Sequence, residues 1–199
     1  MKILIIGGTG TIGSRVASHF AANHEVIVAG SNSGDINVDI EDSSSIENMF
    51  QKAGNADAVI AATGKSKWAP FDEISEEDFY YGLRNKLMGQ VNLVRIGRSY
   101  INIGGSITLT TGILADDPVP GTTSAAMVNG AIHSFVRALV LELKGHPRVN
   151  VVTPGLVEDS AEALGHIFPG YNPIPMEKVV NAYRRSVEGT RTGEIIRVY

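Results

Sequence analysis

A glycine-rich turn near the start of this 199-residue chain is the feature that most constrains its fold. The run Ile3–Ile6 before it is continuously apolar, as expected for a strand buried on both faces of a parallel sheet. The turn reads Gly-Gly-Thr-Gly-Thr-Ile-Gly, which spaces Gly7, Gly10 and Gly13 three residues apart. Apolar residues then recur at helical spacing from Thr11 to Ala22. Strand, tight turn and helix in this order predict the first half of a β-α-β unit.

The rest of the chain continues this alternation of strands and helices. Further strands are predicted at 25–29, 36–40, 57–62, 106–111, 149–153 and 194–199, helices at 43–53, 75–100, 122–143 and 176–188, and a Gly/Pro-rich loop at 165–175. Ser43 is predicted to cap the second helix, and Ser75 with Asp78 forms a near-capping box. Because alternating elements imply right-handed parallel crossovers, we expect an α/β fold. The prediction is one domain over residues 1–199, a Rossmann-type doubly wound parallel sheet of about seven strands with helices on both faces.

Composition excludes several classes of function. The net charge is −4, the isoelectric point is about 5.7, and no basic run exceeds two residues, so neither nucleic acid nor an anionic membrane is an expected partner. There is no cysteine, and the five histidines show no metal-ligand spacing, so no metal site is expected. The apolar run at 3–6 is too short for a signal peptide or a membrane span. We expect a soluble, cytoplasmic protein.

The glycine-rich turn also predicts a ligand. One glycine permits the tight turn, another lets backbone N–H groups approach a diphosphate, and a third packs the helix against the sheet. The helix N-terminus adds partial positive charge at the phosphates. A dinucleotide cofactor is therefore expected here. Its predicted contacts in the turn are Gly7, Thr9, Gly10, Thr11 and Ile12.

The end of the second strand indicates which dinucleotide is preferred. An Asp or Glu there would bind the ribose hydroxyls of NAD and repel the 2′-phosphate of NADP. The chain instead has Ser31, Asn32 and Ser33, with no acid before Asp35. Hydroxyl and amide donors suit a phosphate, so NADP(H) is predicted over NAD(H). The same residues are also common in simple polar turns.

With these segments placed, the chain resembles the short-chain dehydrogenase/reductase family over nearly all its length. The glycines at 7–13 are similar to those of its less typical and extended members, and Asp39-Ile40 resembles the Asp-hydrophobic pair that contacts adenine. Residues 61–64 resemble the segment that walls the adenosine ribose, and Pro154-Gly155 resembles the pair that passes under the nicotinamide. The cofactor positions that this resemblance implies are Asp39, Ile40, Ala62, Thr63, Gly64, Pro154, Gly155 and Leu156.

The catalytic positions of the family are occupied differently in this chain. The family's Tyr and Lys, four residues apart on a helix, fall on Ala125 and Asn129 when 139–143 is matched to the family's Leu-Ala-x-Glu-Leu. Its Ser falls near Thr111, and its Asn falls on Lys86. The resemblance thus implies a member that lacks the Tyr-x-x-x-Lys pair, with Lys86, Thr111 and Asn129 as candidate catalytic residues.

Three interpretations of this loss stay open. In the first, the chain is an atypical oxidoreductase on a small carbonyl or alcohol substrate, where Lys86 polarises or protonates the carbonyl and Thr111 and Asn129 orient it. In the second, it is a non-catalytic dinucleotide-binding regulatory or scaffold protein. In the third, a tyrosine from elsewhere, Tyr171 or one of Tyr80 and Tyr81, replaces the missing one. Lys86 could equally be an ordinary solvated helix lysine.

Two long helices suggest self-association. The predicted helices at 75–100 and 122–143 carry wide apolar faces, which packing against the sheet explains in part. In the family, these two helices pair with their copies. The resemblance therefore implies a homodimer or homotetramer.

Overall fold

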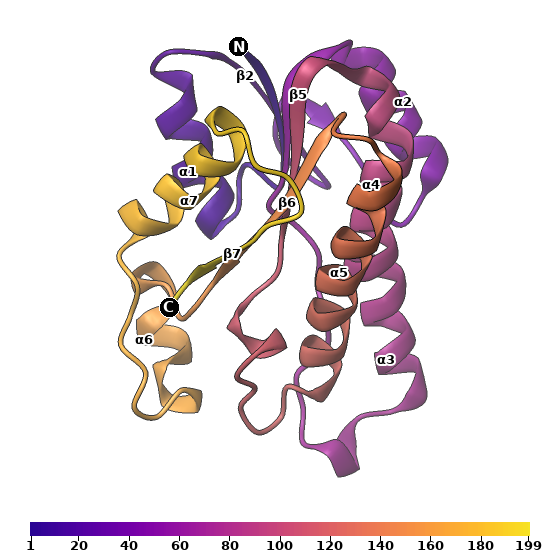
Figure 1. Cartoon of the computed structure of the whole chain (residues 1–199). Coiled ribbons are helices and arrows are strands. Elements are labelled where there is room, and N and C mark those ends of the chain that lie inside the picture. Colours follow the sequence, from indigo (N-terminus) through magenta and orange to yellow (C-terminus); the bar gives the residue numbers. More distant parts are fainter.

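A computed structural model describes all residues, 1–199, and its centre is a parallel sheet of seven strands in the order β3-β2-β1-β4-β5-β6-β7 (Figure 1). The strands are β1 (Lys2–Ile6), β2 (Glu25–Gly30), β3 (Ile36–Asn37), β4 (Ala56–Ala61), β5 (Ile101–Thr110), β6 (Arg148–Pro154) and β7 (Ile195–Val198). The strand order changes direction between β1 and β4, because the chain proceeds to one side up to β3 and to the other from β4 onward. In open sheets of this kind, ligands bind beyond the carboxyl ends of the strands at such a switch point.

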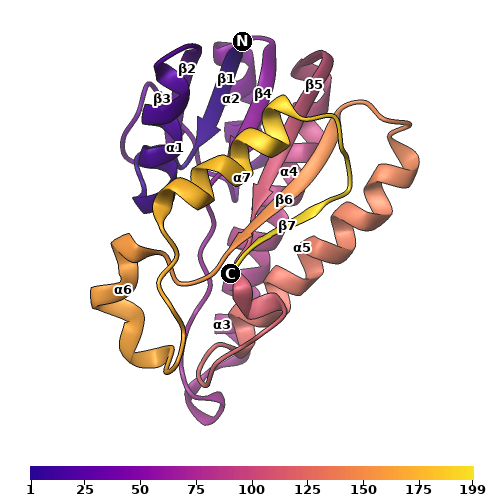
Figure 2. The ribbon, with the colours of Figure 1, turned by 60° about the vertical axis from the view of Figure 1, so that its left-hand side comes forward.

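Helices cover both faces of the sheet, as the alternating pattern predicts. They are α1 (Thr11–Ala21), α2 (Ser43–Ala53), α3 (Glu76–Gly82), α4 (Gly89–Gly97), α5 (Thr123–Glu142), α6 (Glu158–Leu164) and α7 (Met176–Glu188). One core cluster joins α2, α4 and α5 to the sheet, and a second joins α1 and α7 to its other face (Figures 1 and 2). The predicted doubly wound α/β fold is confirmed.

Helix α5 is long and apolar enough to cross a membrane by length and composition alone. In this fold, its residues Val128, Ile132 and Val136 have no exposed side-chain surface. Two of them, Ile132 and Val136, belong to the core cluster on the α2–α4 face of the sheet. The apolar character of this helix therefore has a structural explanation within the domain.

Two predictions around the third strand are wrong, the end of that strand and the cap of the helix after it. The strand predicted at 36–40 ends at Asn37, because Asp39 Oδ1 accepts a hydrogen bond from the N–H of Glu41 (2.9 Å) and turns the chain. The cap of α2 is Asp42 and not Ser43. Its carboxylate accepts from the N–H of Ser44 at 2.8 Å.

The helical region predicted at 75–100 exists but is not uniform. A full capping box opens it, since Ser75 Oγ accepts from the N–H of Asp78 and Asp78 accepts from the N–H of Ser75. A π-helical turn at Leu83–Met88 then separates α3 from α4. Such turns widen the helix locally and often occur at functional sites. This one carries Lys86.

The segment after β6 forms more regular structure than its sequence indicates. Helix α6 was not predicted, and a 3₁₀ turn at Gly165–Ile167 occupies the start of the expected 165–175 loop. Figure 2 shows α6 extending past the sheet below α1 and α7. The segment therefore closes over the carboxyl end of β6 and contributes a wall to the site described below.

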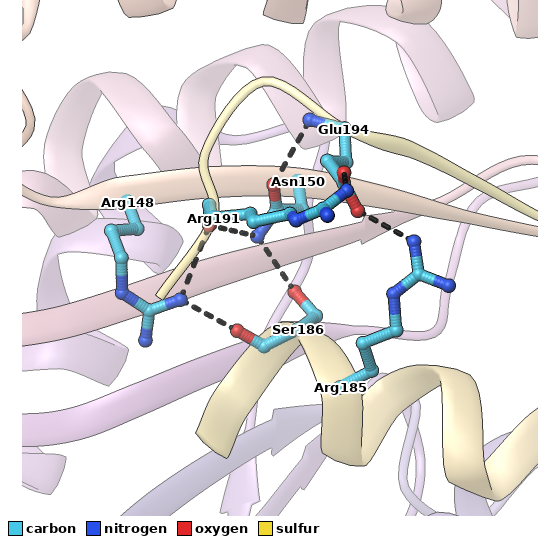
Figure 3. A network of polar contacts seen from close by, with 6 residues as sticks. All are labelled: Arg148, Asn150, Arg185, Ser186, Arg191 and Glu194. Carbon is cyan, nitrogen blue, oxygen red and sulfur yellow. Dashed lines mark hydrogen bonds and ion pairs between the residues drawn. The ribbon is translucent and has the colours of Figure 1, made fainter. Parts of the chain in front are cut away.

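A polar network fixes the C-terminal edge of the sheet (Figure 3). Asn150 of β6 is 1% exposed, and its amide donates to Ser186 Oγ (3.2 Å) and to the carbonyl of Arg191 (3.1 Å). The Asn150 carbonyl oxygen accepts from the N–H of Glu194 at 3.0 Å. Arg148 donates to the carbonyl of Ser186 at 2.7 Å, at the last turn of α7. These bonds hold α7 and the loop before β7 against β6.

Replacing Asn150 with leucine is expected to destabilise the chain by about 2–4 kcal/mol, because the Arg191 carbonyl and the Glu194 N–H lose buried partners. Arg191→Ala is the matched control. Its guanidinium makes only an exposed ion pair with Glu194, and its carbonyl stays in place, so a much smaller loss than in Asn150→Leu is expected. Urea unfolding checks both values. Equal losses in the two variants would contradict the assignment of the stabilising role to Asn150.

Candidate functional site

A cavity of about 1120 Å³ lies at the carboxyl ends of β1, β2 and β4, where the strand order changes direction. Most of the predicted cofactor positions line it. They are Gly7, Thr9, Gly10, Thr11, Ser31, Asn32, Ser33, Asp39, Ile40, Ala62, Thr63 and Gly64. The structure therefore brings together, around one space, four segments that are distant in sequence.

The glycine-rich turn is closely packed at its base. A Cβ on Gly7, whose φ is +79°, would lie 2.3 Å from the carbonyl oxygen of Ala62. A Cβ on Gly13 would lie 2.0 Å from the carbonyl oxygen of Gly7. Only glycine fits at these two positions, because the first turn of α1 lies directly against the end of β1. Gly10 precedes α1 without a side-chain cap, so the first N–H groups of that helix have no intrahelical partner and suit an anion.

The segment after β2 presents hydroxyl and amide groups to the cavity. Ser31, Asn32 and Ser33 are exposed there, and Ser33 Oγ donates to Thr9 Oγ1 at 2.9 Å. The first acid of this segment, Asp35, does not line the cavity. Its carboxylate accepts from the N–H of Val28 at 2.8 Å. No carboxylate therefore lines the cavity from the end of β2, and the two acidic residues that do line it, Asp39 and Glu41, follow β3.

Sequence reasoning missed several residues that line this cavity, among them Glu41, Lys65, Tyr81 and Asn85. Asn85 joins two of them, since its Oδ1 accepts from the N–H of Lys65 (2.7 Å) and its amide donates to Glu41 (2.7 Å). Lys65 directly follows the 61–64 segment and could have been found from that position. Nothing in the sequence indicates Asn85, because the π-helical turn places it there.

A second cavity, of about 190 Å³, lies beyond the carboxyl ends of β5 and β6, and we call it the inner cavity. The four positions aligned with the family's catalytic residues, Lys86, Thr111, Ala125 and Asn129, all line it. The remaining predicted cofactor positions line it too, namely Ile12, Pro154, Gly155 and Leu156. The alignment therefore placed the candidate residues around one small space.

The walls of the inner cavity are largely apolar. They include Ile113, Leu114, Leu164, Phe168 and Trp68. Trp68 packs edge-on against Phe168, with ring centroids 6.4 Å apart, so it belongs to the cavity rather than only covering the core. Phe168 and Leu164 come from the α6 region that the sequence did not predict. The cavity suits a small, mostly apolar molecule with a single polar end.

Lys86 supplies the one cationic side chain of the inner cavity. Burial without a carboxylate partner lowers the pKa of its ammonium group to about 8. The side chain lies over Gly64, where a Cβ would come within 2.8 Å of Lys86 Cγ, and the φ of +108° at Gly64 also favours glycine. Lys86 is thus a half-buried cation that faces the cavity, not a solvated surface lysine.

Asn129 and Thr111 are the buried polar groups beside it. Asn129 is 2% exposed, and its Oδ1 has no hydrogen-bond partner in the protein. A buried oxygen without a hydrogen-bond partner lowers stability unless a ligand donates a hydrogen bond to it. Thr111 is 5% exposed, and its Oγ1 lies 2.8 Å from His133 Nε2. Sequence reasoning missed His133, because its spacing to Thr111 arises only when α5 packs beside β5.

None of the three candidate replacement tyrosines lines the inner cavity. Tyr171 packs against Phe168 with ring centroids 5.4 Å apart, and a hydrogen bond to Asp117 raises the pKa of its phenol. Tyr80 is exposed, and Tyr81 lines the larger cavity. The interpretation in which a tyrosine arrives from elsewhere therefore has no support in the geometry.

Comparison with known proteins finds relatives in both sequence and structure. A family model described as enoyl-(acyl carrier protein) reductase, of the short-chain alcohol dehydrogenase type, matches residues 12–172. The protein lin1944 from Listeria innocua is 42% identical, with a TM-score of 0.96 and full coverage of both chains. A small-chain dehydrogenase crystallised with NADPH is 27% identical, with a TM-score of 0.89, over 100% of this chain and 96% of that one.

Curated relatives are more distant. The hydroxynaphthalene reductase-like protein Arp2 of Metarhizium guizhouense is 26% identical over 165 residues, which cover 78% of this chain and 61% of that protein. The chain therefore spans about three fifths of the length of that relative.

Proposed function

Because the chain belongs to the short-chain dehydrogenase/reductase family, we propose that it binds NADP(H) and acts as an oxidoreductase on a small carbonyl or alcohol substrate. The observation that carries the proposal is the adjacency of two cavities, one lined by the glycine-rich turn and the other by Lys86, Thr111 and Asn129. A dinucleotide whose diphosphate lies on residues 7–13 would direct its nicotinamide toward Pro154-Gly155, which line the inner cavity. The crystallised NADPH complex of a relative supports the choice of cofactor.

The residues present fit this cofactor. Gly7 and Gly13 leave room only for backbone at the base of the turn, and no side chain at Gly10 keeps a diphosphate from the main-chain N–H groups there. The Asn129 Oδ1, which has no hydrogen-bond partner in the protein, can accept a hydrogen bond from a ligand. When bound, reduced nicotinamide supplies a hydride to an electrophilic carbon. The protein then has to hold the carbonyl and stabilise the charge on its oxygen.

We assign these tasks to three side chains. The Lys86 ammonium polarises the carbonyl oxygen or protonates it, since burial brings its pKa to about 8, near the working range of a general acid. Thr111 and Asn129 orient the substrate through their hydroxyl and amide groups. The chain is thus an atypical member in which Ala125 and Asn129 stand at the family's Tyr and Lys positions. Apolar walls around these groups favour a compact, uncharged substrate.

The test is the loss of NADPH absorbance with a panel of aldehydes, ketones and quinones. Wild-type protein is expected to oxidise NADPH with at least one of them, and Lys86→Ala to lose most of this rate while still binding NADPH. The second candidate is a non-catalytic dinucleotide-binding protein, which the non-ionisable Ala125 and Asn129 favour. Tight NADPH binding without turnover of any compound would establish that alternative.

The preference for NADP(H) is expected to depend on the segment after β2. Ser31→Asp places a carboxylate directly after the last residue of that strand, where it would repel a 2′-phosphate. NADPH affinity should fall at least about tenfold, and NADH affinity should hold or rise. Ser31→Ala is the control, because it removes the hydroxyl without adding charge. Fluorescence titration with both cofactors decides, and equal losses in the two variants would show that charge at this position is unimportant.

A further inference from the structure

The Thr111 hydroxyl has a buried hydrogen-bond partner that does not line the inner cavity. His133 lies one helical turn after Asn129 on α5 and is 4% exposed, and its Nε2 is 2.8 Å from Thr111 Oγ1. Thr111 itself lines the inner cavity, and His133 does not. Thr111 therefore links the cavity to an imidazole, the side chain whose ordinary pKa lies nearest to neutrality.

Burial and nearby charges act on the pKa of the His133 imidazole in opposite directions. Burial has the largest effect and lowers this pKa, as do the cations Arg197 and Arg137 of α5. Asp116, which accepts hydrogen bonds from Arg197 (3.0 Å) and Tyr199 (2.7 Å), raises it, and the net pKa lies below the ordinary 6.5. The partly exposed Asp116 also gives the buried ring a neighbour that contacts solvent.

We propose that His133 is a positioning residue that holds and replenishes the proton of the Thr111 hydroxyl, so that Thr111 and His133 together replace the missing Tyr-x-x-x-Lys pair. This inference rests on the proposed carbonyl reduction. As hydride reaches the carbonyl carbon, the π electrons of the C=O bond move to oxygen, and the Thr111 O–H proton passes to that oxygen. The Thr111 oxygen takes the Nε2–H proton of imidazolium His133, which leaves neutral imidazole, and solvent later restores the proton.

This assignment divides the chemistry between two groups. The Lys86 ammonium stabilises negative charge on the substrate oxygen, and Thr111 delivers the proton. Reduction then requires both Lys86 and His133 to be protonated. The reduction rate at saturating substrate should therefore fall twice as pH rises, first through the pKa of His133 below 6.5 and again near 8 as Lys86 loses its proton.

The experiment compares wild type with His133→Gln, which keeps a side-chain N–H for Thr111 but cannot titrate. The compound of the carbonyl panel that wild type reduces fastest is the probe. We expect kcat to fall about 10- to 100-fold, KM and NADPH affinity to change less than about twofold, and the lower pH transition to disappear while the one near 8 remains. Thr111→Ser should retain most of the rate, and Thr111→Val should lose as much as His133→Gln. His19→Gln, at an exposed histidine of α1, is the control and should match wild type.

A second readout does not depend on turnover. NMR titration of the His133 ring should show a changed pKa in Thr111→Val and an unchanged one in Thr111→Ser. An active wild type whose pH profile is the same in His133→Gln, or a His133 titration unaffected by Thr111→Val, would overturn the inference alone. Failure of wild type to reduce any carbonyl of the panel would overturn the proposed function and this inference together.

Discussion

Gly13→Ala is expected to abolish measurable NADPH binding, with an affinity loss of about 100-fold or more, and to destabilise the chain by about 1–3 kcal/mol. The added methyl would lie 2.0 Å from the Gly7 carbonyl oxygen and 2.9 Å from Gly8 Cα, which are backbone atoms with little room to move. The first turn of α1 must therefore shift away from the turn, and the N–H groups that would bind the diphosphate shift with it. Fluorescence titration and urea unfolding measure the two effects.

Substitutions at two further glycines distinguish an effect on cofactor binding from an effect on packing. A Cβ on Gly10 meets nothing closer than the Gly7 carbonyl oxygen at 3.4 Å, so Gly10→Ala should stay folded and lose affinity only through crowding of the diphosphate. Gly130 on α5 has nothing within 4 Å, so Gly130→Ala should stabilise the helix by about 1 kcal/mol at most and leave binding unchanged. Wild-type affinity in Gly13→Ala would refute the placement of the phosphates.

The parts of the fold that could be predicted are those set by local pattern. Ile3–Ile6 is apolar throughout because β1 lies between two neighbouring strands and two helical layers, and none of these residues is more than 1% exposed. The capping box at Ser75 is likewise a local signal, with its hydrogen bonds formed within four residues. The parallel pairing of the strands and the helices on both faces follow from the alternation of such elements.

The parts that could not be predicted depend on contacts between distant residues. Strand β3 stops after two residues because Asp39 turns the chain, although 36–40 has the alternation of a strand. Helix α6 spans only seven residues, and none of them is fully buried, although Ala161 and Leu164 pack against a small apolar cluster. Its ends are fixed by tertiary contacts, such as Glu158 accepting from the N–H of Met176 at 2.8 Å.

The candidate site likewise contains residues that the sequence indicates and one that it does not. Lys86, Thr111, Ala125 and Asn129 were located by matching segments to a family, and all four line one cavity. His133 was missed because a histidine eight residues after Ala125 has no meaning in sequence. Its relevance appears only in the fold, where the packing of α5 beside β5 places its ring 2.8 Å from the hydroxyl of Thr111, a residue that lines the cavity.

Lys86→Met is expected to make the protein more stable at pH 7 and to lower the rate of carbonyl reduction by about 100-fold or more. The folded-state pKa of about 8 lies below the unfolded value of about 10.4, so the unfolded chain binds more protons between these two pH values. Stability of wild type should therefore rise with pH from about 8 to 10.4, and the full cost of burying the cation should be present below about 8. Replacing the buried ammonium with an apolar side chain should raise the free energy of unfolding at pH 7 by on the order of 1–3 kcal/mol. In the variant, the free energy of unfolding should no longer rise between about pH 8 and 10.4.

Lys178→Met, at an exposed lysine of α7, is the matched control and should change neither stability nor rate. Urea unfolding at pH 7 and pH 10, together with NADPH oxidation, gives the required comparison. A side chain that lowers stability and supports the reaction is typical of a functional site, where charged groups are kept out of water at a cost in free energy. If Lys86→Met unfolds more easily than wild type and reduces carbonyls at the same rate, Lys86 has a packing role, and the proposed charge stabilisation in the inner cavity is wrong.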